Sequence, residues 1–593
     1  MLLRVLPFFL TTLSILLLTA CSKQTSTRST AKPDQAEEVV ASQDEPIAND
    51  ADSQDIQYIK WTPELNIPDP VSISFDDRGR AYVTQTRRRR ANDLDIRGQR
   101  DWIVDDVSFN HVDDKEAFLK AQLDPERAEE NKDRFLDHNG DGAIDWRDLA
   151  VLSESIYLIE DTDDDGFADS SKVYYDDFKT LVTGVAAGVL WHEGDVYATV
   201  APDVWKFRDT DGDDIPDQKE VLAHGFGVHI AYGGHDMHGL IVGPDGKIYW
   251  SIGDKGINVT SKGGKQFFYP NQGGMLRANP DGSDFEVFAR GLRNVQEPAF
   301  DNYGNWFGVD NDSDQTGETE RFMYIVDGMD AGWRNDYQYR GDGYNPWMEE
   351  KMTIPHHKGQ AAYITPTIRN YVDGPAGFVK NPGTALNERY KDYFFLNATM
   401  NGAQYAFQVE PDGASFKMVN DHQIGKGLPL IGLTWGLDGA LYTPDWGGGY
   451  PMNETGAIWK LDTPGGNQAI RAEVEQLLLE GMAERNVPQL RELLSHPDQR
   501  IRLNAQFELV KRNETGSLVE DSQADHQLKR IHAVWGLGQL ARAEDETAIN
   551  QLLKLLDASD PEIQVQASKV LGDLKPGSFN GQVLIPLCDS DHP

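Results

Sequence analysis

The sequence predicts a mainly β fold, a six-bladed propeller, followed by an all-α solenoid of paired helices. A hairpin pattern of apolar alternation, a glycine-tipped turn and an aromatic-rich strand recurs about six times, mostly every ~50 to 60 residues, which is typical of propeller blades. After about residue 471 the apolar residues change to helical spacing. We therefore expect two structured regions, residues 57–463 and 468–593.

The propeller prediction comes from individual hairpins. In the clearest one, the apolar residues 240–242 precede a Gly-Pro-Asp-Gly turn at 243–246 and a strand at 248–250. Strands of period two joined by a tight turn of this kind form β-hairpins. The remaining copies begin at 71–75, 189–191, 298–300, 393–396 and 433–435. A β-sandwich with coincidental turns is the alternative.

The C-terminal region reads as helical repeats. Val474, Leu478 and Met482 have the spacing of one helix face, and apolar pairs of helices follow. Pro497, Pro561 and the final proline are 64 and 32 residues apart, so the repeat has a period of about 32 residues. This region resembles HEAT repeats. Because it stops at an inter-helix turn without a polar cap, we expect a truncated array.

The first residues predict the compartment. Residues 1–21 have the charged, apolar and small-residue order of an export signal, and Cys21 directly after Leu-Thr-Ala resembles a bacterial lipobox. The polar stretch 22–56 lacks the apolar content of a folded segment and should be a disordered linker. We expect a protein lipid-anchored through Cys21 on the periplasmic side of the cell envelope, at the outer membrane. An ordinary signal with a chance cysteine is the alternative.

Composition excludes several classes of protein. The 593 residues carry a net charge of −40, so nucleic-acid binding is disfavoured. The mean hydropathy of −0.53 excludes a polytopic membrane protein. With only two cysteines and no CxxCH, thiolate zinc sites, iron–sulfur clusters and a c-type haem are not expected within these residues.

Three acidic loops predict calcium sites. Such closely spaced carboxylates repel one another unless a cation binds between them. The alternative is an acidic turn that is simply exposed to solvent. The first loop follows the EF-hand spacing, with helices expected at 126–136 and 146–155 in an insertion at about 86–156. The expected ligands are Asp137, Asn139, Asp141, Asp145 and Asp148 in the first loop; Asp161, Asp163, Asp165 and Asp169 in the second; and Asp209, Asp211, Asp213, Asp217 and Glu220 in the third. We expect a structural role.

The candidate active site centres on His235. This histidine directly precedes the clearest hairpin, and Arg293 and Asn294 stand at the start of the next blade. Residues at such positions can converge on the central channel, where a histidine can act as general base and an Arg-Asn pair can bind an anionic or carbonyl-bearing ligand. A structural histidine at a blade edge is the alternative.

At these residues the chain resembles the soluble glucose/sorbosone dehydrogenase family. That resemblance implies a six-bladed propeller that uses pyrroloquinoline quinone and calcium to oxidise sugars or alcohols. It also implies that His235 takes the substrate hydroxyl proton, and that Arg293 and Asn294 face cofactor and substrate. Leu292 departs from the family pattern, and the further basic residues that hold the quinone carboxylates are not identified.

A closer resemblance is to the membrane-bound dehydrogenase domain proteins of planctomycetes and verrucomicrobia, which join such a propeller to HEAT repeats and commonly to a c-type cytochrome domain. The stretches that carry it are 87–89, 93–97, 137–149, 160–169 and 435–446. The basic run 87–90 by itself predicts only a solvated segment.

The favoured hypothesis is an envelope-anchored, quinoprotein-like dehydrogenase that oxidises a sugar or alcohol and passes electrons to a haem domain or a cytochrome c partner. The alternative is a non-catalytic, calcium-stabilised scaffold for a glycan or protein, with the partner bound on the helical face. A hydrolytic lactonase-type propeller is a third possibility.

Overall fold

The computed structural model describes residues 55–91, 94–311, 320–339, 346–350, 352, 364–449 and 452–589. The predicted signal 1–21 with its lipidation site Cys21, and nearly all of the linker 22–56, lie outside these residues. Among the helices that are described, none is long and apolar enough to span a bilayer.

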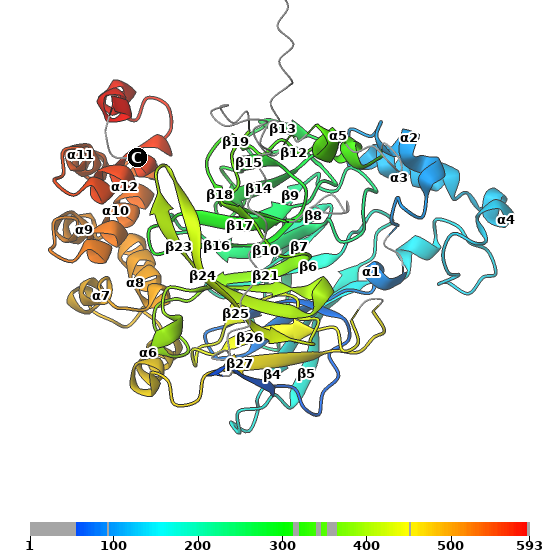
Figure 1. The fold of residues 1–593 in the computed structure, drawn as a ribbon, viewed down its shortest axis with the longest axis horizontal. Coiled ribbons are helices and arrows are strands. Elements are labelled where there is room, and N and C mark those ends of the chain that lie inside the picture. The colour runs from blue at the N-terminus through cyan, green and yellow to red at the C-terminus, as the bar shows by residue number, and fades with distance from the viewer. Residues whose placement is uncertain are drawn as a thin grey trace, which may run out of the picture. The chain divides into compact units, whose positions relative to one another are not determined.

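The strands form six blades, each an antiparallel sheet of four main strands (Figure 1). Blade 1 contains β2 (Pro70–Phe75), β3 (Ala81–Gln85), β4 (Glu154–Glu160) and β5 (Ser170–Phe178). Blade 2 contains β6 (Ala186–His192), β7 (Asp195–Val200), β8 (Asp203–Arg208) and β9 (Gln218–His224). Blade 3 contains β10 (Met237–Val242), β11 (Ile248–Ile252), β14 (Gly273–Ala278) and β15 (Glu286–Leu292). Blade 4 contains β16 (Val295–Phe300), β17 (Trp306–Asp310), β18 (Arg321–Ile325) and β20 (Arg369–Asn370). Blade 5 contains β21 (Pro375–Lys380), β22 (Phe394–Ala398), β23 (Ala403–Asp412) and β24 (Ser415–Lys426). Blade 6 contains β25 (Thr434–Trp435), β26 (Leu441–Asp445), β27 (Ala457–Asp462) and β1 (Gln57–Lys60).

Two shorter pairings accompany blade 3. A parallel edge strand, β19 (Met329–Asp330), lies beside β15, and β12 (Ile257–Thr260) pairs with β13 (Gln266–Tyr269) in a separate hairpin.

The ring of blades closes through its two ends. The N-terminal strand β1 pairs with β27, so that the last blade contains the first strand of the chain. At the inner strands, the Gly377 amide donates to the Ile431 carbonyl at 2.8 Å, and the Gly432 amide donates to the Val71 carbonyl at 3.1 Å. These bonds join blade 5 to blade 6 and blade 6 to blade 1. The prediction of a six-bladed propeller is confirmed, because closure of this kind leaves no open sheet edge between first and last blades.

The insertion between β3 and β4 packs onto the propeller. It contains α1 (Arg88–Ala91), α2 (Ile103–Asp106), α3 (Val112–Gln122) and α4 (Ala128–Asn131). Its apolar side chains, among them Ile96, Trp102 and Leu119, share one buried cluster with Val228 and Ile230 of the segment before β10. Burial of this area fixes the insertion beside the start of the inner strand of blade 3.

The prediction of two helices around the first acidic loop is wrong. Residues 126–136 contain only a 3₁₀ turn (Pro125–Arg127) and the one-turn α4, and residues 146–155 contain only a 3₁₀ turn (Asp148–Ala150) before β4 begins. At the end of the second span, Glu154 and Ser155 already belong to β4, which pairs with β3 and β5.

The C-terminal region consists of stacked antiparallel helices, as the apolar spacing predicts; HEAT membership stays a prediction. The helices are α6 (Gln468–Glu480), α7 (Val487–Leu493), α8 (Gln499–Lys511), α9 (Thr515–Asp521), α10 (Gln527–Arg542), α11 (Glu546–Leu555) and α12 (Pro561–Gly572), followed by a 3₁₀ segment (Gly581–Asp589). Asp498, Asp545 and Asp560 cap the N-termini of α8, α11 and α12 through their side chains.

The helices α8, α10 and α12 contact the hairpin turns of blades 3 and 4. Gln506 donates to the Pro244 carbonyl at 2.8 Å, and Gln566 donates to the Tyr303 carbonyl at 2.7 Å. The Arg277 guanidinium of β14 pairs with Asp573 at 2.9 Å. These contacts occupy part of the surface of the three helices.

Replacing Arg502 tests this interface. The side chain is buried and donates to the carbonyls of His496 and Pro497 at 2.7 and 2.8 Å and to Asn302 Oδ1 at 2.8 Å. Because each buried acceptor left without its donor costs ~1–3 kcal/mol, Arg502→Ala should lower the free energy of unfolding by about 3 to 5 kcal/mol in chemical denaturation. Lys511→Ala, at an exposed position of the same helix, should change it by less than ~0.5 kcal/mol. Equal effects of the two variants would contradict the assigned interface.

Candidate active site

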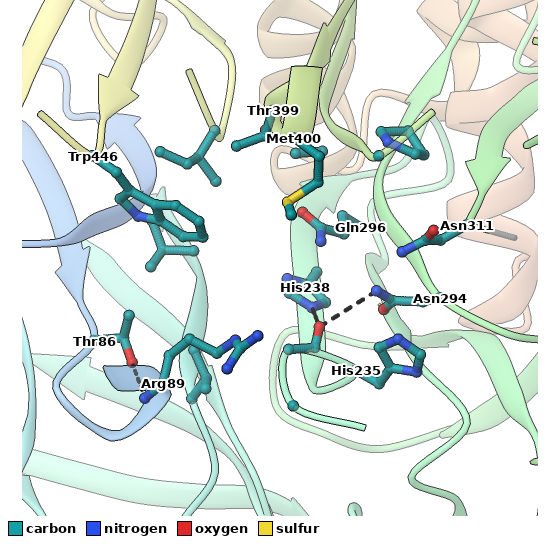
Figure 2. A pocket seen from close by; sticks show the side chains of 18 of the residues that line it. Thr86, Arg89, His235, His238, Asn294, Gln296, Asn311, Thr399, Met400 and Trp446 are labelled. Atoms are coloured by element: carbon teal, nitrogen blue, oxygen red, sulfur yellow. Dashed lines mark hydrogen bonds between the residues drawn. The ribbon is translucent and has the colours of Figure 1, made fainter. Parts of the chain in front are cut away.

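A cavity of about 410 Å³ lies on the propeller axis where the inner strands begin (Figure 2). Its walls come from the starts of inner strands and the loops before them, from residues that directly follow second strands, and from the insertion in blade 1. His235, His238 and Asn294 supply polar groups from blades 3 and 4, and Trp446 of blade 6 supplies an aromatic face. A concave site with few convergent polar groups is the usual form of a small-molecule site.

His235 forms a hydrogen-bonded pair with Asp254. Nδ1 of His235 lies 2.7 Å from Asp254 Oδ1, while Asp254 Oδ2 accepts from Trp333 Nε1 at 2.8 Å and from Gln338 Nε2 at 3.1 Å. Burial alone would raise the pKa of Asp254, but the His235 imidazole, the Arg293 guanidinium and the Trp333 N–H together hold this pKa below its ordinary value. An ionised carboxylate only accepts, so Nδ1 of His235 carries the proton and Nε2 is the basic nitrogen.

Arg293 and Asn294 are positioned by one buried carboxylate. Both backbone amides donate to Asp310 Oδ1, at 2.9 and 2.8 Å. Arg293 is fully buried, with its guanidinium 5.5 Å from the Tyr232 ring and 5.7 Å from the Trp333 ring, and it is not among the residues that line the cavity. Its positive charge favours the ionised form of Asp254 in the His235–Asp254 pair.

Asn294 does line the cavity. Its Nδ2 donates to the Gly234 carbonyl at 3.4 Å, whereas its buried Oδ1 has no hydrogen-bond partner in the described part of the chain. A buried acceptor without a donor is costly, so a ligand hydroxyl or amide that donates to Oδ1 would be favoured here.

His238 is a second histidine in the cavity wall. His238 and Asn294 approach the same Gly234 carbonyl from different sides (Figure 2). Nε2 of His238 donates to the Gly234 carbonyl at 3.0 Å. Burial lowers the pKa of His238 to about 4, so its imidazole is neutral at physiological pH. Below it, Asp236 pairs with Lys255 at 2.7 Å. His238 therefore contributes a neutral polar group to the cavity wall, and its hydrogen bond to Gly234 fixes the orientation of the ring.

The insertion supplies two arginines that the sequence interpretation did not assign to the site. Arg89, from the run read as a solvated segment, lines the cavity, and Figure 2 shows its side chain extending into it. Its neighbour Arg88 is buried and donates to the carbonyls of Thr180 and Leu149, both at 2.8 Å. Arg88 therefore anchors the run that carries Arg89.

Arg97 is the second arginine. Its guanidinium lies 4.4 Å from the Tyr232 ring and pairs with Asp95 at 2.6 Å, and Asp95 Oδ2 also accepts from the Gly233 amide at 2.9 Å. The insertion is thereby bonded to the backbone next to His235. A signal was present in the sequence, since both arginines fall in stretches that carry the family resemblance, but nothing in their spacing points to the propeller axis.

None of the residues expected to bind calcium lines this cavity, and the second and third acidic loops lie at hairpin tips. Asp161, Asp163 and Asp165 lie between β4 and β5, and their ligand atoms are within 4.8 Å of one another; Asp209, Asp211 and Asp213 form the same arrangement between β8 and β9. The other residues expected in these loops make different contacts: Asp169 accepts from Thr162, Asp217 from Thr210, and Glu220 pairs with Lys262.

The first loop is arranged differently from the other two. Asp141 and Asp145 both pair with Arg147, and Asp148 accepts from the backbone amides of His138, Asn139 and Asp145. Asp137 accepts from Gly140 and Gly142, and Asn139 accepts from Asp141. The strongest EF-hand spacing in the sequence thus folds into a loop in which arginine and backbone N–H groups contact the expected ligands.

The fold and the site together define a six-bladed propeller with a histidine-containing, polar-walled cavity on its axis. A family model described as a domain of unknown function (DUF7133) matches residues 54–428. The protein belongs to this family. The search of curated proteins found no match.

Several solved structures are similar at low identity. The PQQ-bound aldose sugar dehydrogenase of Streptomyces coelicolor is 13% identical, over 69% of this chain and 98% of its own, with a TM-score of 0.41. An oxidoreductase described as a glucose dehydrogenase from Thermus thermophilus is 15% identical, over 68% and 99%, with a TM-score of 0.41. The PQQ domain of pyranose dehydrogenase from Coprinopsis cinerea is 11% identical, over 70% and 96%, with a TM-score of 0.37. The fold assignment rests on the sheets of the present structure.

Neutral His238 has a consequence for stability. Between pH 6.5 and about 4 the unfolded chain binds a proton at this histidine that the folded chain does not, so acidification through this window destabilises the folded state. The melting temperature of the wild type should therefore fall more steeply between pH 6.5 and 4.5 than that of His238→Gln. His224 pairs with Asp203, which raises its pKa, so the stabilisation from this pair is lost only as pH rises above 6.5. Between pH 6.5 and 4.5 the profile of His224→Gln should therefore run nearly parallel to that of the wild type. Parallel pH profiles for wild type and His238→Gln would contradict the assignment.

Proposed function

We propose that the protein is an envelope-anchored, quinone-dependent dehydrogenase that oxidises a sugar or another alcohol in the axial cavity. The observation that carries the proposal is the His235–Asp254 pair, held at 2.7 Å in the wall of that cavity. A histidine oriented by a buried carboxylate is an effective general base. The resemblance of the same residues to the glucose/sorbosone dehydrogenases supports this role.

The residues in the cavity fit pyrroloquinoline quinone, a planar anionic group. Arg89 and Arg97 present guanidinium groups for its carboxylates, and Asn294 Oδ1 offers a buried acceptor that lacks a donor. On the wall of blade 6, Trp446 offers an indole face whose orientation is fixed by a 2.9 Å hydrogen bond to the Pro70 carbonyl. These groups would hold the quinone through its charged edge and its flat face.

In this reaction His235 moves the proton. Nε2 of His235 takes the proton of the substrate hydroxyl, and Asp254 stabilises the imidazolium that results. Trp333 and Gln338 hold Asp254 in place through its second oxygen. When bound, pyrroloquinoline quinone would supply the oxidation itself, as the acceptor of the hydride from the carbon that bears this hydroxyl. His238 and Gln296, which also line the cavity, orient the hydroxyl groups of the substrate.

The remaining parts of the proposal rest on the sequence. They are acylation of Cys21 as the anchor, a periplasmic location at the outer membrane, and onward transfer of electrons to a haem domain or a cytochrome c partner. Calcium would stiffen the hairpins at 161–169 and 209–217, and the two trios of close carboxylates support this assignment.

Reconstituted activity tests the proposal. Protein incubated with pyrroloquinoline quinone and calcium should reduce an artificial acceptor dye with some member of a panel of sugars and alcohols. Because general-base catalysis contributes about 10²–10⁴-fold, His235→Ala should lower kcat at least ~100-fold, and Asp254→Asn should lower it less. The matched control is the surface pair His224 and Asp203, with the same 2.7 Å contact; His224→Ala should leave the rate unchanged. Absence of turnover across the panel, or a rate that does not respond to His235→Ala, would defeat the proposal.

Quinone binding tests the role of the insertion separately from turnover. Since a charged hydrogen bond contributes ~1.5–3 kcal/mol, Arg89→Gln should weaken the binding of pyrroloquinoline quinone about 10- to 100-fold in isothermal titration calorimetry. Arg87→Gln is the control, because Arg87 belongs to the same run but does not line the cavity. If both variants bind as tightly as the wild type, the quinone carboxylates do not contact Arg89.

A further inference from the structure

The axial cavity ends at a ring of six residues, one from each inner strand or the segment leading into it. Five of these positions carry no side chain or a small one, and the sixth carries a glutamate. The ring consists of Ser72, Gly188, Gly239, Glu297, Gly377 and Gly432. In five of the six blades the strand pairing shifts register close to this position, as expected where inner strands bend to approach one axis.

The ring separates two cavities. Residues that directly precede it line the upper cavity, namely Val71, His238, Gln296, Ala376 and Ile431. Residues that directly follow it line a second cavity of about 250 Å³, namely Ile73, Val189, Leu240, Pro298, Phe378 and Leu433. The walls of this lower chamber are mainly apolar, and Gln499 and Leu503 of α8 line it on the side of the helical region.

The backbones around the ring approach one another too closely for side chains. A Cβ atom on Gly432 would lie 2.8 Å from the Val71 carbonyl oxygen and 2.9 Å from Glu297 Oε1, and a Cβ on Gly239 would lie 2.5 Å from the Gln296 carbonyl oxygen. Contacts this short exclude any larger residue. The small residues therefore leave the centre of the ring to the one long side chain at position 297.

Glu297 reaches from blade 4 past blade 5 to blade 6. Its Oε2 accepts from the Phe378 amide at 3.1 Å and from the Leu433 amide at 3.0 Å, which belong to the inner segments of blades 5 and 6. Its Oε1 faces the Gly432 position. One carboxyl group thus joins three of the six blades at the narrowest level of the channel.

We infer that Glu297 is an axial plug, whose side chain closes the ring between the two cavities and makes the upper cavity a blind pocket with a single mouth. The plug positions the floor of the candidate active site, because its sequence neighbour Gln296 lines that floor. This inference does not depend on the proposed redox reaction, since it concerns the separation of two cavities.

The charge state of the plug suits this position. Burial raises the pKa of Glu297 to about 8, so the carboxyl group is protonated at neutral pH, and no ion pair to it is found in the described part of the chain. His238, which directly precedes the ring position Gly239, lines the upper cavity and is neutral. Lys380 lines the lower chamber, and its ammonium lies 3.3 Å from Asp392.

Crystal structures of three forms of the full chain test the plug directly. In the wild type and in Glu297→Gln, which keeps the length and the acceptor oxygen, we expect a closed ring. In Glu297→Gly, which adds a sixth small residue, we expect a continuous file of ordered waters from the upper cavity to the lower chamber. Waters that pass the ring in the wild type, or a ring that stays closed in Glu297→Gly, would overturn the inference.

A second measurement keeps the inference testable if Glu297→Gly does not fold. Between pH 4.5 and about 8 the folded chain holds a proton at Glu297 that the unfolded chain has released, so the wild type loses stability relative to Glu297→Gln as pH rises through this window. The unfolding constant of the wild type, relative to the variant, should rise up to tenfold per pH unit there and level off above pH 8. Glu388→Gln, at an exposed position, should show no such trend. A difference between wild type and Glu297→Gln that is constant over this range would contradict a buried, protonated plug.

Discussion

The convergence of six inner strands on one axis is the constraint on which the rest of this structure depends. Pairing of β1 with β27 closes the ring, and each inner strand then begins at the same end of the channel. Side chains that precede these strands are brought together although they are far apart in sequence. His235 and Asn294 share one cavity for this reason, and Trp446 joins them because it follows β26, which runs antiparallel to the inner strand β25. The channel end, and not any single motif, creates the site.

Buried carboxylates connect neighbouring blades. Much of the chain's acidity, with a net charge of −40, is exposed, yet several carboxylates are buried and accept backbone N–H groups across blade junctions. These acceptors are Glu154 for Ala186 at 2.7 Å, Glu320 for Gly374 at 2.6 Å, Asp236 for Val185 at 3.2 Å, and Glu297 for Phe378 and Leu433. Hydrogen bonds of this kind satisfy amides at the inner ends of strands that the sheets leave unpaired. A propeller built this way needs acceptors on its axis, and the chain supplies them as side chains.

Much of this architecture could be predicted from the sequence, because hairpins and helix pairs leave periodic signals. The position of His235 and Asn294 at the starts of consecutive blades follows from the same periodicity. Arg89 could not be placed, since its approach to the axis depends on how a non-repeating insertion packs. Asp254 is visible in the motif after the hairpin, but its contact with His235 depends on the bulge in β10. Spacing alone also does not reveal that Arg147 pairs with two carboxylates of the first acidic loop.

The most direct measurement is a crystal structure of the protein soaked with pyrroloquinoline quinone and calcium. We expect electron density for the quinone in the upper cavity, between the Trp446 indole and His235, with a carboxylate against Arg89 and a quinone oxygen near His235 Nε2. Density in the lower chamber or on the outer surface, or an upper cavity that holds only water at saturating quinone, would contradict it.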